Sequence, residues 1–408
     1  MKKLLMMIGA AAVAVSANAD TYTDANNITW TYVANSDGEN TVTLGTDTTT
    51  PCIPKNVDVN AADIPWTFEK DGTSYTVTQV GYCAFYGCTR LTGILSVPPA
   101  VNAFGGLAFY NTRLTGVDSF GDGVATMTGQ SFFGQCTGLT GTVVMGDGFT
   151  HTYGRYFFTG CTGITGLIIG RGSAQGDLYF ANGCTALAGA WFKGSATVAS
   201  GTQTKQVVNM SQAFAGCSAL KVVLFGRHTT WSTSGGFITG ATDCNVFVPA
   251  DGGFSKLGLG NDSNTLIPYG AGTSLDLEID ENAGTITATP TTEERLVQVL
   301  EAAPVFKAQF GLNTRINVTN TIEATAGTIT AAMLNAVEFN TMLMTFAVKT
   351  QAQLDSVLAA VPQTAMLAID PTGARQELTL PSDRAIWVWL AGDGKYTPKI
   401  KGLMIVFH

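Results

Sequence analysis

Residues 132–141 read FFGQCTGLTG, and residues 157–166 read FFTGCTGITG, 25 positions further along the chain. Related phrases lie near residues 84, 108, 180, 213 and 237, and their first apolar positions are 23 to 25 residues apart except for one interval of 33. Self-similarity at such a period is typical of proteins in which each copy is one structural unit. We therefore expect about seven repeats of ~24 residues between residues 67 and 250.

Each copy has two kinds of apolar spacing. Phe133, Cys136 and Leu139 are three residues apart, which predicts a turn with one buried side. Leu167 and Ile169 alternate with their neighbours, which predicts a short strand. One unit cannot bury its apolar side alone, so we expect the units to stack as a solenoid of parallel strands with rows of like residues in the core. The expected rows are Phe85, Phe109, Phe133, Phe158 and Phe214; Cys88, Cys136, Cys161, Cys184 and Cys217; and Leu91, Leu114, Leu139, Ile164, Leu187 and Leu220.

The repeated phrase resembles the BspA-like (Treponema pallidum-type) bacterial leucine-rich repeats, whose pattern is roughly A-F-x-x-C-x-x-L-x-x-I-x-I-P. The first copy matches this pattern at Ala84, Phe85, Cys88, Leu91 and Ile94. The second copy departs from it by lacking one residue and the cysteine, and the strands are rich in glycine and alanine. The resemblance implies an extracellular or surface module that binds a macromolecule, often in adhesion to host or neighbouring cells. It implies no catalytic residues.

The N-terminus has the pattern of an export signal. Residues 1–19 read MKKLLMMIGAAAVAVSANA, with two lysines, a short apolar stretch and an Ala-Asn-Ala end. This arrangement is typical of a cleaved signal peptide. No later apolar run is long enough for a transmembrane helix. We therefore expect a secreted or cell-surface protein.

The rest of the chain divides by composition. We expect a mainly β fold with these parts: an N-terminal β cap at 20–66, the leucine-rich-repeat solenoid at 67–250, a glycine-rich linker at 251–273 and a small α+β domain at 274–408. A turn at Ser36-Asp37-Gly38 predicts a hairpin in the cap. In the last domain, phrases starting at Thr292 and Thr350 share one helical pattern, and each ends at a proline. They predict two related strand–helix–strand units, and Thr350 with Gln353 fits a capping box.

Eight cysteines in an exported chain raise the question of disulfides. Five of them belong to the repeats, where stacked side chains point in parallel and suit disulfide geometry poorly. We expect those thiols to be buried and reduced. For Cys52 and Cys83 both a bridge and two buried thiols remain open.

The sequence offers little for catalysis. Three histidines leave no multi-histidine site, and a net charge of −8 lacks the basic excess that nucleic-acid binding needs. Asp118 and Asp122 form either a calcium turn or a polar loop. We expect no catalytic residue, no cofactor and no metal site. We therefore rank an enzyme below a binding protein and a structural scaffold.

Three basic residues follow the strands of the fourth, fifth and sixth copies: Arg171, Lys193 and Arg227. Stacking would bring them into one row, a candidate binding surface for an acidic glycan or protein. The alternative is that they only keep a strand edge soluble. The long interval before Phe214 contains a polar stretch, residues 195–205, which we expect to project as a loop near Lys193.

These patterns lead to two hypotheses of function. The first is a secreted or surface protein that binds an extracellular protein or a glycan, or adheres to a neighbouring cell, through its solenoid. The alternative is a structural scaffold of the envelope in which the repeats are spacers and residues 274–408 do the docking.

Overall fold

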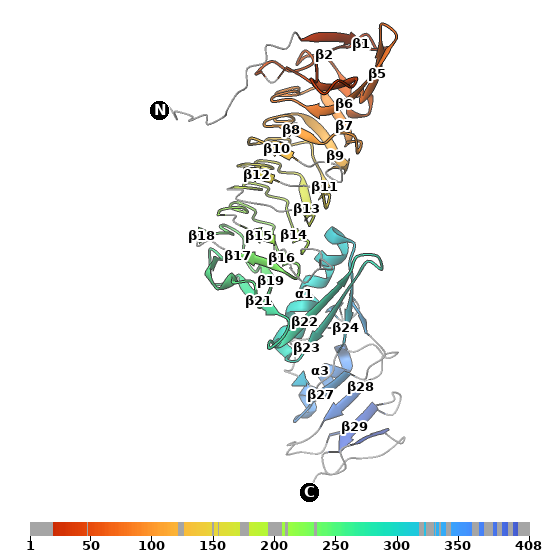
Figure 1. Ribbon diagram of the computed structural model, residues 1–408. Helices are drawn as coiled ribbons and strands as arrows, with labels where there is room; N and C mark the ends of the chain where they lie inside the picture. The colour runs from red at the N-terminus through yellow and green to blue at the C-terminus, as the bar shows by residue number, and fades with distance from the viewer. Residues whose placement is uncertain are drawn as a thin grey trace.

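A computed structural model describes the chain from residue 19 to residue 398. The described part excludes residues 47, 121–125, 149–150, 154, 172–178, 195–205, 209–210, 232–234, 318–321, 324–329, 331, 334–335, 340–343, 361–366, 371–377, 382–385 and 391–394. Most of the expected signal peptide, Asp122 and the 195–205 insertion therefore lie outside the described residues. The chain is elongated, with the N-terminal strands at one end, the stacked repeats in the middle and the C-terminal region at the other (Figure 1).

The repeats form one main layer of parallel strands, which confirms the predicted solenoid. Its first sheet contains β4 (Val59–Asn60), β7 (Leu91–Ser96) and β9 (Arg113–Ser119). Its second sheet continues with β11 (Gly141–Met145), β13 (Ile164–Ile169), β14 (Gly189–Phe192), β16 (Val222–Phe225), β19 (Asn245–Pro249) and β21 (Thr265–Tyr269). The N–H of Thr140 donates to the carbonyl of Thr115 at 3.2 Å, so the two sheets adjoin.

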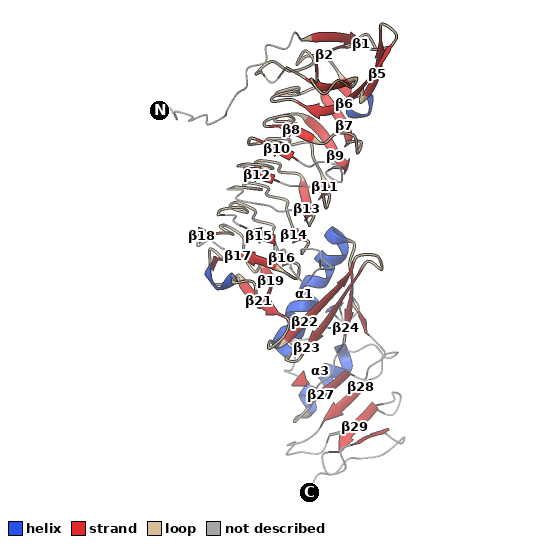
Figure 2. Ribbon diagram, viewed as in Figure 1, coloured by secondary structure: helices blue, strands red, loops and turns tan. Residues whose placement is uncertain are grey.

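A second layer of short parallel strands lies on the return side of the coils (Figure 2). It comprises β6 (Thr73–Val80), β8 (Ala103–Gly105), β10 (Thr126–Thr128) and β12 (His151–Tyr153), then β15 (Gln206–Val208) with β17 (Thr229–Trp231) and β18 (Gly235–Gly236) with β20 (Leu257–Gly258). The sequence predicted one strand in each repeat, so this second layer of strands was not expected. Most of these strands have two or three residues, too few to show an alternating pattern.

The turns between the layers repeat one backbone geometry. In the first six copies, the residue two before and the residue two after the first apolar position (Phe85, Phe109, Phe133, Phe158, Ala181 and Phe214) are left-handed, with φ between 55° and 76°. They are Cys83, Leu107, Ser131, Tyr156, Tyr179 and Gln212 before it, and Gly87, Asn111, Gln135, Gly160, Gly183 and Gly216 after it. Glycine adopts this conformation without strain, which explains its recurrence at the second position.

The phenylalanine, cysteine and leucine or isoleucine rows all lie in the core, and each of their side chains is at most 1% exposed. Successive rings stack: Phe85 and Phe109 have centroids 5.0 Å apart, and Phe133 and Phe158 have centroids 5.5 Å apart. Each coil of the solenoid, formed by one repeat, is called a rung below. The rings therefore bury apolar surface between neighbouring rungs as well as within each rung.

The cysteine row also makes a repeated hydrogen bond. The Sγ atom of Cys136 donates to the carbonyl of Phe109 at 2.9 Å, and Cys161 donates to Phe133 at 3.0 Å. Cys184 and Cys217 make the same bond to the preceding rung. The carbonyls of Phe133, Phe158 and Ala181 also accept a backbone N–H within their own turn, so the thiol adds a second hydrogen bond that links two neighbouring repeats. All eight cysteines are free and buried, including Cys52 and Cys83.

The first rung is covered by antiparallel strands. β1 (Asp20–Thr23), β2 (Thr29–Ala34) and β3 (Thr41–Leu44) form a meander, so the hairpin predicted around Gly38 is confirmed. β3 then pairs in parallel with β6, and β5 (Thr67–Lys70) pairs with β6 in the opposite sense. A 3-10 turn (Ala61–Asp63) leads out of β4.

The expected glycine-rich linker is wrong, because residues 251–273 continue the solenoid. A 3-10 turn (Phe254–Lys256) leads into β20, and β21 pairs in parallel with β19 over five residues. Ile267 and Tyr269 of β21 are buried. The glycines occupy turns, such as Gly260 with φ of 83°, and do not separate two domains.

The C-terminal region contains two parallel strand–helix–strand units. The first is β23 (Thr285–Pro290), α1 (Glu293–Phe310) and β24 (Asn313–Ile316), flanked by β22 (Leu275–Asp280) and β26 (Glu338–Phe339). The second is β27 (Met344–Ala347), α3 (Gln351–Ala360) and β28 (Leu367–Asp370), with β25 (Ile322–Glu323), β29 (Ile386–Leu390) and β30 (Lys395–Pro398). Each unit has its own sheet.

Both helices start where the sequence predicts. Thr292 caps α1, and Thr350 and Gln353 bond reciprocally as a capping box before α3. The predicted end of α1 at Pro304 is wrong, since the helix continues to Phe310 and ends at Gly311. Its last turns are held by burial of aromatic side chains, which outweighs the loss of one backbone hydrogen bond at proline.

Candidate functional site

The outward face of the main strand layer carries a row of apolar residues. Strand pairing aligns them across six strands: Val144, Ile168, Trp191, Leu224, Phe247 and Ile267. All but Val144 are buried in one cluster with α1 and its sheet. The rings of Phe247 and Phe306 lie 5.5 Å apart, and those of Trp191 and Phe310 lie 5.9 Å apart. The C-terminal region therefore covers the outward face of β13 to β21.

Small residues let α1 approach this face closely. A Cβ atom on Gly189 would lie 2.8 Å from Val305 Cγ1 and 3.0 Å from Phe310 Cζ. One on Gly166 would lie 2.8 Å from an oxygen of Gln309. These contacts give a physical reason for glycine in strands of the fourth and fifth repeats.

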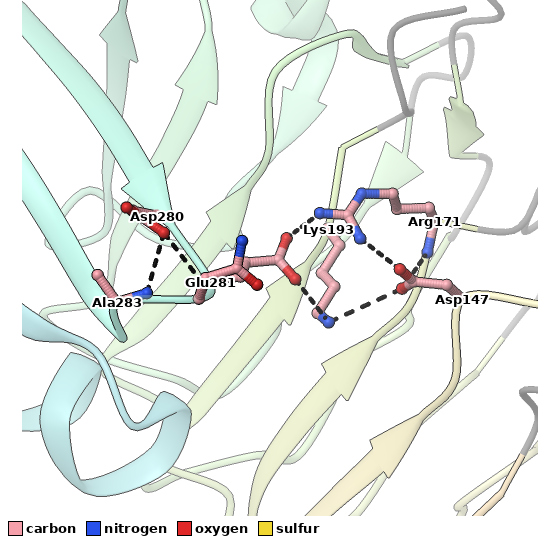
Figure 3. Close-up of polar contacts among 7 residues, drawn as sticks. Asp147, Arg171, Lys193, Asp280, Glu281 and Ala283 are labelled. Atoms are coloured by element: carbon pink, nitrogen blue, oxygen red, sulfur yellow. Dashed lines mark hydrogen bonds and ion pairs between the residues drawn. The ribbon is translucent and has the colours of Figure 1, made fainter.

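Arg171 and Lys193 lie beside the hairpin of β22 and β23 (Figure 3), and Arg227 contacts the same hairpin at Asp276. Arg171 pairs with Asp147 of the preceding rung and with Glu281 of the hairpin. The Nζ atom of Lys193 lies 2.9 Å from Glu281 and 3.7 Å from Asp147. Four charges of alternating sign thus join the solenoid to the hairpin.

The hairpin turn positions Glu281 for these contacts. The carboxylate of Asp280 accepts the N–H groups of Asn282 at 3.0 Å and Ala283 at 2.9 Å. These two bonds fix the turn around Glu281, so its carboxylate faces the solenoid (Figure 3).

Arg227 makes a second contact with the same hairpin. It pairs with Asp276 at 2.6 Å and donates to the carbonyl of Leu277 at 3.1 Å. Its guanidinium lies 6.0 Å from the ring of Tyr269, whose hydroxyl donates to Phe225 at 2.6 Å. Burial raises the pKa of Tyr269, so its hydroxyl stays protonated as a donor.

The structure therefore brings together the three cations named from the sequence but pairs each with carboxylates of this chain. Their charges hold the C-terminal region against the solenoid. An acidic partner would need a row of unpaired cations that face solvent. These three side chains do not form such a row, because each is paired with a carboxylate of this chain.

The strands nearer the N-terminus leave their outward face open. We call this the open strand face, and it consists of Thr92, Ile94 and Ser96 of β7, Thr115 of β9 and Val144 of β11. Ile94 is 56% exposed and Val144 39%, and they are the exposed large hydrophobic residues of the described part of the chain. The face is rich in hydroxyl groups, and β9 adds an exposed residue of each charge: Arg113, which is aligned with Thr92 of β7, and Asp118 near the end of the strand.

The sequence also suggested Asp118 and Asp122 as candidate residues, and only Asp118 is among the described residues. Asp118 is exposed at the end of β9. Across the described ranges, no three His, Cys, Asp or Glu side chains are grouped so as to hold a metal ion. Among those same residues, no helix combines the length and apolar character needed to cross a membrane.

The outward apolar row was missed in the sequence, although a signal for it exists. Strands buried on both faces read as continuous apolar runs. The runs LII at residues 167–169, AWF at 190–192 and VVLF at 222–225 are of this kind, whereas polar residues and glycine flank or interrupt the apolar residues of TGILS at 92–96 and RLTGVDS at 113–119. The continuous runs begin with VVM at 143–145 in β11, the first strand that α1 contacts, through Thr142 and Gln309.

One family profile and two solved structures are similar to parts of this chain. A profile of the BspA-type leucine-rich repeat region matches residues 72–188 in six copies. A leucine-rich cell surface protein from Faecalibacterium prausnitzii aligns at 15% identity over 62% of this chain and 95% of its own, with a TM-score of 0.27. A leucine-rich repeat protein from Bacteroides ovatus aligns at 14% identity over 83% and 98%, with a TM-score of 0.24. No curated protein matches the chain.

Proposed function

We propose that this protein, whose solenoid contains a BspA-type leucine-rich repeat region, is a secreted or cell-surface protein that binds a macromolecular partner through its open strand face. Solenoids present extended surfaces that their repeats hold rigid, and such surfaces are used for binding. The signal-peptide pattern of residues 1–19 supports export.

One observation carries the choice of surface. The main strand layer is covered by α1 from β13 onward, and α1 also reaches Thr142 of β11 through Gln309. The layer is left open at β7, at β9 and at Val144 of β11. Ile94 and Val144 stand on the open part, and apolar side chains exposed on a rigid strand face are suited to burial against a partner. The open strand face is therefore the part of this layer that a partner can reach.

The chemistry of the open strand face favours a protein partner. Threonine, serine and aliphatic side chains can form hydrogen bonds and apolar contacts with a neutral protein surface. A sulfated or carboxylated glycan would need a cluster of unpaired cations, whereas Arg113 is a single cation beside Thr92 and the basic row is engaged with Glu281 and Asp276. An extracellular protein is thus the partner class we propose.

A second candidate function is a structural scaffold. The specific observation in its favour is that the ion pairs of Arg171, Lys193 and Arg227 serve cohesion within the chain. In that case the solenoid would be a rigid spacer between the N-terminal cap and the C-terminal region.

A binding screen with matched variants separates the two. The full chain would be tested against purified extracellular proteins and a glycan array, together with Ile94→Glu and Thr115→Arg on the open strand face. Thr239→Arg, at an exposed turn residue, is the control. Protein binding that both face variants abolish and the control retains would support the proposal. Glycan binding alone would change the partner class, and no binding at all would favour the scaffold.

A further inference from the structure

The main strand layer ends at β21, which lies at the end of the stacked strands (Figure 1). Within the described part of the chain, β21 pairs with β19 on one side and with no strand on the other. β22 follows in the sequence but belongs to another sheet, where it pairs with β23. We call the free side of β21 the terminal edge. Such an edge presents N–H and C=O groups that a strand of another chain can pair with.

The hydrogen bonds of β21 show which residues face the terminal edge. The N–H of Thr265 donates to the carbonyl just before β19 at 2.9 Å, and the carbonyl of Tyr269 accepts the N–H just after β19 at 3.0 Å. Both residues therefore face β19. The backbone groups of alternate residues in a strand point to opposite sides, so Leu266 and Pro268 face the terminal edge. Both are partly exposed.

The proline removes a hydrogen-bond donor from the terminal edge. Leu266 offers an N–H and a C=O, whereas Pro268 offers only a C=O, because its ring takes the place of the N–H hydrogen. A strand that approached this edge would lose one hydrogen bond and would meet the proline ring. Proline in a sheet is confined to such edges and is one of the ways in which natural sheets avoid pairing with another chain.

The edges at the N-terminal end are protected by other means. The first strand of the main layer, β4, has only two residues, and a short edge strand offers little to pair with. In the cap, the outer strands β1 and β5 meet: Lys70 pairs with Asp20 at 2.5 Å, and the rings of Tyr22 and Phe68 stack 4.6 Å apart. The terminal edge belongs to a strand of five residues, so the strand that a second copy could best offer to it is its own β21.

We propose that Pro268 prevents this chain from forming a dimer through β21. Two identical edges pair with two-fold symmetry, so the dimer that Pro268 prevents is an antiparallel pair of β21 strands. The proline acts twice in such a pair, once from each copy. The partner is a second copy of this chain, and the proposal does not depend on the function proposed for the open strand face.

The test measures molecular mass by light scattering during gel filtration, over a range of protein concentrations. Pro268→Val and Pro268→Ala both restore the N–H, and valine also favours a strand. Pro99→Val, at an exposed turn residue, is the control. We expect both variants at residue 268 to form dimers, with Pro268→Val doing so at a concentration at least about tenfold lower than the parent chain. The control should behave like the parent chain.

Hydrogen exchange at Leu266 locates the contact. In the parent chain its amide should exchange rapidly at every protein concentration, because among the described residues it has no acceptor. In the dimers of the variants the same amide should be protected. Unfolding midpoints establish that each variant is folded.

Several results would overturn the proposal. They are a monomer for both variants at residue 268 over the whole range, equal association of Pro99→Val, and a Leu266 amide that exchanges as fast in the dimers as in the parent chain. Protection of Leu266 in the parent chain that increases with concentration would also contradict it, because the terminal edge would then already pair. This last measurement uses no variant, so it holds even if a replacement of Pro268 fails to fold.

Discussion

The Nζ atom of Lys193 lies 2.9 Å from a carboxylate oxygen of Glu281, joining the fifth repeat to a hairpin 88 residues further along the chain. The same carboxylate pairs with Arg171, and both cations also face Asp147 (Figure 3). The side chain of Lys193 is 18% exposed and that of Glu281 28%, so solvent screens this network less than a fully exposed pair. The network is therefore placed to stabilise the contact between the two parts of the chain.

We expect Glu281→Gln to lower the free energy of unfolding of that contact by about 1 kcal/mol, since partly exposed ion pairs contribute little each and this residue serves two. Urea unfolding at low and high salt would measure it, and the difference from the parent chain should shrink at high salt. Glu278→Gln on the same hairpin, at an exposed residue, is the control. Equal effects of the two variants would contradict a role for the network.

Replacing core rings should be far more costly. Phe133→Ala and Phe158→Ala each remove a ring that is fully buried and stacked on its neighbours in the row. We expect losses of about 3–5 kcal/mol, as for other large-to-small core changes. Thr137→Ala, at an exposed turn residue of the same repeat, should change stability little. A parent-like denaturation midpoint for either phenylalanine variant would show that its ring is not part of the core.

The thiol row should make the protein sensitive to alkali. Burial raises the pKa of Cys136 to about 11 and that of Cys217 to about 12. In the unfolded chain thiols ionise near pH 8.5, so above that pH the unfolded state loses protons first and is favoured. Stability is thus complete below about pH 8.5 and falls by about 1.4 kcal/mol per pH unit for each such thiol as pH rises towards the folded pKa.

Urea unfolding under reducing conditions between pH 7 and pH 10 would measure this fall. In Cys217→Ala the slope above pH 8.5 should be smaller by one thiol, whereas the stability below that pH changes only through lost packing. The native row should also resist alkylation at pH 8, since the reactive thiolate is absent. Rapid labelling of Cys136 or Cys217 in the folded protein would contradict the buried row.

Periodicity was sufficient to predict the turns, the main strands and their buried rows, because each inward position repeats in every copy. It failed where a structure depends on contacts between distant segments. Pro304 has the local signal of a helix end, yet Phe306 and Phe310 extend α1 because the solenoid offers them a surface. The glycines near Gly260 resembled a linker because the local sequence does not show the partner of the next strand. β21 pairs with β19 of the preceding repeat, and this contact makes the segment part of the solenoid.

The same reasoning explains the basic row. Stacking correctly brings Arg171, Lys193 and Arg227 together, but their partners Glu281 and Asp276 lie on a hairpin whose position depends on α1. No local pattern specifies which carboxylates will face a strand edge. The paired state of these cations could therefore be found only from the folded chain.

Two glycines at the same position of their repeats allow a direct test of how α1 is seated. Gly189 lies under α1, and an added Cβ would meet Val305 at 2.8 Å and Phe310 at 3.0 Å. Gly116 lies by the open strand face, and its nearest neighbour would be Ile94 at 3.6 Å, an ordinary contact. We expect Gly189→Ala to destabilise the protein by about 1–3 kcal/mol through overpacking, and Gly116→Ala to have little effect.

Hydrogen exchange would locate the change as well as measure it. In Gly189→Ala the amides of α1 should exchange faster while those of β7 and β9 stay protected, because only the contact between helix and sheet is strained. Gly116→Ala should leave both regions as in the parent chain. If Gly189→Ala left α1 fully protected and the unfolding midpoint unchanged, the helix would not rest on this strand, and the division of the layer into a covered and an open part would be refuted.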